Sequence, residues 1–274
     1  MAIAKFARRR RMNFSLLLLS CLMVAVLLRL VDISLANPTE WSGWILLIGC
    51  FALFVYAGRK RLSMLPLGRV AIWLQAHLYI GMFCLFVFGM HIEWRFPSGW
   101  FENGLAVSFI GTVVTGVIGI FWSRKLPGRI TRLGDEVMYD RIPSFAVALN
   151  NEAEQLVLES VEKTGSLAVA DFYQKSGHYF FGRPRFQWPR LYRAHEPSHK
   201  LERELDSLRR YMRDDDSVFA DQMCQLVRKK DLLDAHYTLQ GALKHWLTVH
   251  VVFAAAIIPM VLLHIVLVYG FTSI

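Results

Sequence analysis

Five long apolar runs alternate with polar segments along the chain. They cover residues 14–33, 41–58, 70–92, 104–123 and 246–271. Each run is long enough, as a helix, to cross a hydrocarbon layer about 30 Å thick. Tryptophans such as Trp41, Trp100 and Trp246 lie near the ends of several runs, where indole rings favour the membrane interface. The pattern predicts an all-α integral membrane protein with five transmembrane helices.

The polar stretch 124–245 separates the fourth run from the fifth. Residues 149–163 have an amphipathic pattern, and Pro197 is suited to open a helix that ends near Met212. Residues 217–245 read as a helix leading into the last run, allowing a break near Asp231, whereas 177–196 read as loop. We therefore predict three parts: membrane helices over 1–123, a helical insert over 124–245, and a final membrane helix over 246–274.

Composition agrees with a membrane chain, and the charge sets its orientation. Of the 274 residues, 54% are hydrophobic and 19% are charged, with a net charge of +9. Lysine and arginine cluster before the first run, after the second and after the fourth, whereas the opposite connections hold only Arg95. The positive-inside rule places the N-terminus and the insert in the cytoplasm and the C-terminus across a bacterial-type inner (plasma) membrane. Because topology accounts for the basic excess, we expect membrane lipid rather than nucleic acid as a partner.

The first run could also be compared with a cleavable signal, because Arg8–Arg11 precede it. Its apolar stretch continues to about Val31, which is longer than the core of a signal peptide. We interpret it as a membrane helix.

Four histidines lie inside the apolar runs. His77 and His91 belong to the third run, and His250 and His264 to the fifth. The two histidines of each run are fourteen residues apart, which turns a helix through about 1400°, about 40° short of four full turns. Both histidines of a run therefore lie on one face of the helix. They are about 21 Å apart along its axis. The two runs point the same way, which brings His77 level with His250 near the cytoplasm and His91 level with His264 near the other surface.

An imidazole in hydrocarbon is costly without a partner and indicates a functional site. Two facing imidazoles can bind one haem iron through both axial positions. We therefore predict two non-covalent, bis-histidine haem b groups, the inner held by His77 and His250 and the outer by His91 and His264.

Small and basic residues near the histidines fit the same interpretation. Gly81 and Gly89 would let a flat macrocycle approach the third helix. Arg69 and Arg95 lie near opposite membrane surfaces and could pair with haem propionates.

Two other metal or haem motifs are excluded. No CxxC or CxxCH occurs, which excludes covalent c-type haem and ordinary cysteine-ligated metal sites. His195–His199 spells HExxH, but Pro197 opposes the continuous helix that a zinc protease needs.

The duplicated spacing resembles the dihaem cytochrome b architecture, which includes the cytochrome b of quinol–cytochrome c reductases and the membrane core of ferric reductases and NADPH oxidases. The resemblance covers the second to fifth runs and implies a four-helix bundle that carries electrons across the membrane. We expect an oxidoreductase subunit of a respiratory chain, with a quinone or a cytoplasmic donor or acceptor on one side and a c-type cytochrome or iron–sulfur protein as redox partner. Neither family's own substrate is carried over to this chain. The flavin and nicotinamide domain of the reductases and the Pro-Glu-Trp-Tyr stretch of the quinol-oxidising family are absent.

Two other functions remain open from the sequence. A haem-free membrane anchor or scaffold would recruit partners through the insert. A proton-coupled transporter would use the histidines as a relay, although the runs hold few acidic partners. The sequence also leaves open whether the chain turns over a substrate itself.

Overall fold

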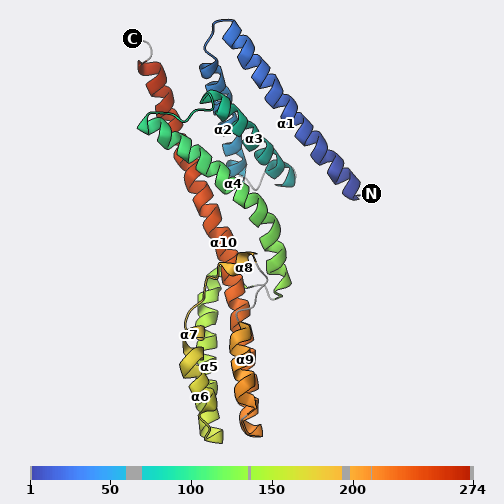
Figure 1. The fold of residues 1–274 in the computed structure, drawn as a ribbon, viewed down its shortest axis with the longest axis vertical. Helices are drawn as coiled ribbons and strands as arrows, with labels where there is room; N and C mark the ends of the chain where they lie inside the picture. Colours follow the sequence, from blue (N-terminus) through green and yellow to red (C-terminus); the bar gives the residue numbers. More distant parts are fainter. Residues whose placement is uncertain (1, 60–69, 135–136, 193–197, 211, 272–274) are drawn as a thin grey trace. The chain divides into compact units, whose positions relative to one another are not determined.

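The computed structural model describes residues 2–59, 70–134, 137–192, 198–210 and 212–271. Within these ranges the regular structure is entirely helical (Figure 1). The all-α class expected from the hydrophobic pattern is confirmed.

Five helices are long and apolar enough to cross a membrane. They are α1 (Ala2–Ile33), α2 (Pro38–Arg59), α3 (Val70–His91), α4 (Trp100–Arg132) and α10 (Asp214–Phe271). The five predicted transmembrane helices therefore have counterparts of the right length and composition, as expected of a multi-pass membrane protein. Which membrane they cross, and in which orientation, stays a prediction.

Helices α4 and α10 continue well beyond the apolar runs. The 58 residues of α10 would extend about 87 Å, far more than a hydrocarbon layer of about 30 Å. Its apolar run is 246–271, and the polar part, 214–245, is predicted to lie outside the hydrocarbon. The break that we allowed near Asp231 is absent, because α10 is described without interruption through that residue.

The chain forms two compact units. The first comprises Met1–Val114 and Val251–Ile274, and the second comprises Thr115–His250. The boundaries fall inside α4 and α10 rather than in loops. The three-part division at 123/124 and 245/246 stays a prediction.

The first unit packs its transmembrane-length helices through a small apolar core. Cys84 and Phe88 of α3 are buried against Phe109 of α4 and Ile257 of α10, while α1 contacts α3 through Val24, Leu28 and Val87. Many large apolar side chains point outward instead, including Leu19, Ile48 and Phe51. A surface of this kind is suited to lipid rather than to water.

The second unit contains the smaller helices. They are η1 (Tyr139–Arg141), α5 (Ile142–Thr164), α6 (Ala168–Phe172), η2 (Tyr173–Gly177), α7 (His178–Phe181), α8 (Pro189–Tyr192) and α9 (Ser198–Arg209). Their apolar faces meet α10 around Phe172, Phe181 and Met223. Burial, followed by the charge of Glu154, raises the pKa of Tyr173 to about 12.

The segment 177–196, which we expected to be loop, contains two one-turn helices. Phe180 and Phe181 of α7 are buried, and so is Leu191 of α8. These side chains hold short helices that glycine and proline spacing alone did not indicate.

Candidate functional site

The structure brings His91 and His264 together. His91 is the last residue of α3 and His264 lies in α10, both in the first unit. Their ring centroids are 6.3 Å apart, with the ring planes at 81°. The matched depth inferred from the spacing therefore corresponds to a close approach of these two imidazoles.

One ring nitrogen of His91 is fixed by α2. Nδ1 lies 3.1 Å from the carbonyl oxygen of Thr39 and 3.0 Å from Oγ of Ser42. A carbonyl can only accept, so this bond requires the proton on Nδ1 and leaves the lone pair of the neutral ring on Nε2. Ser42 is buried and donates its own hydroxyl proton to the Thr39 carbonyl at 2.8 Å.

This arrangement is the one that metal-bound histidines use. Their second nitrogen donates to a carbonyl or carboxylate, which fixes the tautomer and the ring orientation. Thr39 and Ser42 therefore orient the His91 ring and leave its lone pair on Nε2.

His250, in the second unit, is held in a similar way by α4. Its Nδ1 lies 2.9 Å from Oγ1 of Thr115. The Trp246 ring stacks on the imidazole at 6.0 Å between centroids and 24° between planes, and its Nε1 donates to the Thr115 carbonyl at 2.7 Å. Thr115 thus bonds both His250 and Trp246, which lies one helical turn before His250.

A hydroxyl residue followed by glycine occurs beside both histidines. A Cβ at Gly43 would lie 3.3 Å from Cε1 of His91, and a Cβ at Gly116 would lie 3.5 Å from Cε1 of His250. In each case the hydroxyl lies within hydrogen-bond distance of Nδ1, and the glycine leaves room for the edge of the imidazole ring. Sequence reasoning missed Ser42, Gly43 and Thr115; the signal was a Ser-Gly or Thr-Gly pair inside an apolar helix.

The spacing of the outer pair suits a haem iron. Each metal–imidazole bond is about 2.0 Å long, so two imidazoles on opposite sides of one metal have centroids about 6 Å apart. The 6.3 Å separation of His91 and His264 is close to this value. If haem is bound, its porphyrin supplies the remaining ligands, and His91 and His264 would be the two protein ligands. The residues present therefore fit an axially ligated haem.

The inner pair is divided between the two units. His77 lies in α3 of the first unit, whereas His250 lies in the second. Their pairing stays a prediction. One turn beyond His77, a Cβ added at Gly81 would meet no atom within 4 Å among the described residues, so space is open beside the helix at this level.

The remaining predicted site residues either have neighbours other than a histidine or lie outside the described residues. Gly89 accommodates the Trp94 indole, whose ring atoms would lie 2.6 Å from an added Cβ. Arg95 is exposed just after α3, and Arg69 lies outside the described residues, as do His195 and Glu196 of the HExxH sequence. Contacts of Gly89, Arg69 and Arg95 with haem stay predictions.

Across the described part of the chain, no group of three or more His, Cys, Asp or Glu side chains is arranged to hold a metal ion. No family model matches the chain, and no curated protein and no solved structure matches it either. The candidate site is thus argued from its own geometry.

Proposed function

We propose that this protein is a membrane-embedded dihaem b-type cytochrome. It would carry electrons across the membrane between a quinone or cytoplasmic redox partner and a partner on the opposite side, as a subunit of a redox complex. The observation that carries the proposal is the 6.3 Å approach of His91 to His264, with Nδ1 of His91 bonded to a carbonyl.

In this proposal His91 and His264 would hold the outer iron, and Thr39 and Ser42 orient His91. His77 and His250 would hold the inner iron, and Thr115 orients His250. When bound, haem supplies one-electron chemistry that protein side chains lack. The histidines of each helix are about 21 Å apart along its axis, so two haems held at these levels would let an electron cross in steps rather than in one jump.

The lipid-facing helices supply the setting. Half-buried imidazoles at two predicted depths suit a carrier within an inner membrane, and a c-type cytochrome or iron–sulfur protein would accept or deliver electrons at its surface. A quinone would be the membrane-soluble partner.

The test is the visible spectrum of the full chain, expressed with ample haem and purified in detergent. We expect a b-type α-band after dithionite reduction and about two haems per chain by pyridine haemochrome. His91→Ala and His264→Ala should each remove one haem, and the double variant should lose no more than either single variant, because both residues hold the same iron. His178→Ala, at an exposed position of α7, is the control and should keep both.

A folded but colourless protein would overturn the proposal. The haem-free anchor or scaffold would then become the better function, and replacing all four intramembrane histidines would leave complex assembly unchanged. Equal haem content in His91→Ala and wild type would also contradict the assignment of the outer pair.

A further inference from the structure

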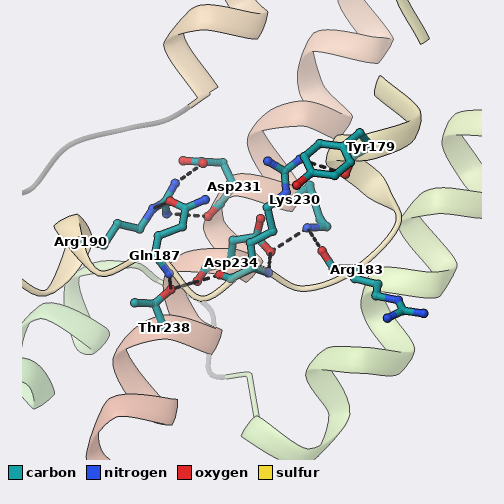
Figure 2. A network of polar contacts seen from close by, with 9 residues as sticks. Tyr179, Arg183, Gln187, Arg190, Lys230, Asp231, Asp234 and Thr238 are labelled. Carbon is teal, nitrogen blue, oxygen red and sulfur yellow. Dashed lines mark hydrogen bonds and ion pairs between the residues drawn. The ribbon is translucent and has the colours of Figure 1, made fainter. Parts of the chain in front are cut away.

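Residues 183–187, which connect α7 to α8, are fastened to one face of α10 (Figure 2). Lys230 Nζ donates to the carbonyl of Arg183 at 3.1 Å. The backbone N–H of Arg185 donates to Asp234 Oδ1 and that of Gln187 to Thr238 Oγ1, both at 3.1 Å. We call residues 183–187 the strap.

The residue spacing of the strap matches the spacing of the bonded residues along α10. Successive α10 residues in this set are four positions apart, which is a rise of about 6 Å. Alternate residues of an extended chain are about 6.6 Å apart. Every second strap residue therefore meets the next turn of α10, and Pro184, which has no N–H, falls between the bonded positions.

A buried ion pair fixes the end of the strap. Arg190 bonds the carboxylate of Asp231 and donates to its backbone carbonyl at 2.9 Å. Both side chains are buried, so the charge of Arg190 is matched and is not offered to a partner. The exposed surface of α8 is therefore formed by residues other than Arg190.

The adjoining helix α8 lies at the level of the predicted membrane boundary. Leu191 is buried with Leu126, Leu239 and Ala242, and Trp122 packs against the same cluster. Leu126 is one turn, about 6 Å, past Trp122, where the fourth apolar run ends. Arg129 secures this position by donating to the Leu191 carbonyl at 2.9 Å.

The outward side of this region is aromatic and basic. Trp188 and Tyr192 are 63% and 75% exposed, and Tyr179 is also exposed. Arg183 is exposed as well, and Figure 2 shows its guanidinium pointing away from the network. Residues 179–192 contain no acidic side chain, so nothing within the segment offsets this charge.

We propose that residues 183–192 form a membrane-surface anchor for anionic phospholipid. Trp188 and Tyr192 enter the headgroup layer, as indole and phenol rings do at membrane interfaces. Arg183 pairs with lipid phosphate, and the strap holds these side chains at the boundary by fixing their backbone to α10. This inference concerns the lipid surface and holds whether or not haem binds.

The test measures depth in the full chain, reconstituted in nanodiscs with or without phosphatidylglycerol. A spin label is placed at position 188 by Trp188→Cys, and at position 192 by Tyr192→Cys as a second probe, after the four native cysteines are replaced. Leu158→Cys in α5, where the native side chain is 70% exposed, is the matched control.

We expect labels at 188 and 192 to collide more with membrane-dissolved oxygen than with a water-soluble nickel complex, and the label at 158 to do the reverse. Arg183→Gln should weaken binding of fluorescent phosphatidylglycerol roughly fivefold, as expected for one basic residue near an anionic surface. Lys175→Gln, at an exposed site of η2, should leave that binding unchanged.

Water-like accessibility at both 188 and 192 in anionic nanodiscs would overturn the proposal and would leave the surface to a protein partner. Equal depth in neutral and anionic nanodiscs, with unchanged lipid binding by Arg183→Gln, would overturn the role of the anionic headgroup.

Discussion

At the scale of single residues, the candidate site depends on side chains that orient the histidines. Ser42 and the Thr39 carbonyl fix Nδ1 of His91, and Thr115 takes the same position on His250. The adjoining Gly43 and Gly116 leave space for each ring. The Thr39 carbonyl requires the proton on Nδ1 of His91, and the Thr115 hydroxyl contacts the corresponding nitrogen of His250.

Gly43→Val should remove the outer haem. A Cβ alone would lie 3.3 Å from the His91 ring, and the valine methyl groups would force the imidazole away from His264. Haem per chain should fall from about two to about one, measured by pyridine haemochrome in the proposed cytochrome.

The matched control is Gly49→Val, also on α2. Its Cβ would meet Cys84 Sγ of α3 at 2.5 Å, so it crowds the same two helices without touching a histidine. Equal haem loss in both variants would attribute the effect to helix spacing and would contradict the role of Gly43.

The histidines were predictable from the sequence, but their orienting residues were not. Repeated spacing on two parallel helices indicated that His91 and His264 share a level. Which residue of a third helix reaches Nδ1 depends on how that helix is rotated, and Ser42 and Gly43 are ordinary residues within an apolar run. For Gly89 the sequence predicted a contact with haem, whereas the structure places the Trp94 indole beside this glycine.

At the scale of elements, the polar half of α10 is organised by residues four positions apart. Lys230 and Asp234 have no exposed side-chain surface, and Nζ lies 2.6 Å from Oδ1. Burial lowers the pKa of Lys230 and raises that of Asp234, because both groups are removed from water. Asp234 also accepts a hydrogen bond from the backbone N–H of Arg185, so its carboxylate bonds both Lys230 and the strap.

Asp234→Ala should destabilise the full chain by about 3 kcal/mol, because it leaves a buried ammonium without its counter-ion and a strap N–H without an acceptor. Denaturant unfolding in detergent, followed by circular dichroism, measures the change. The double variant Lys230→Met with Asp234→Leu should recover most of the loss.

Lys229→Ala is the comparison for this variant. Lys229 is exposed, and its Nζ lies 3.8 Å from Glu152, so a change of at most about 0.5 kcal/mol is expected. If Asp234→Ala were as mild as Lys229→Ala, the buried pair would not secure the strap.

The sequence predicted a helix over 217–245 because its apolar positions recur at helical spacing. A break was allowed near Asp231, but α10 runs through this residue without interruption. Its partner is Arg190, 41 residues away along the chain, and such a contact has no signature in local periodicity.

At the scale of the whole molecule, the five apolar helices give an odd number of predicted crossings, so α1 is predicted to begin on one side of the membrane and α10 to end on the other. Hydropathy is a local property, so the sequence sufficed to find these helices. Their orientation depends on where basic residues lie relative to the bilayer, which a helix arrangement alone does not reveal.

Thiol labelling of intact cells checks the orientation. Leu35 lies between α1 and α2 and is 97% exposed, on the side predicted to face away from the cytoplasm, whereas Leu158 belongs to the predicted cytoplasmic insert. In a background without native cysteines, an impermeant maleimide should label Leu35→Cys directly and Leu158→Cys only after permeabilisation. The opposite pattern would invert the topology.

The placement of His250 and His264 on α10 has a consequence for biosynthesis. Translation delivers α3 first and must then complete residues 124–245 before the apolar part of α10, 246–271, leaves the ribosome. A nascent chain therefore carries only half of its proposed ligands while the intervening region emerges. Cofactor loading would accordingly be a late event, completed only when α10 enters the lipid.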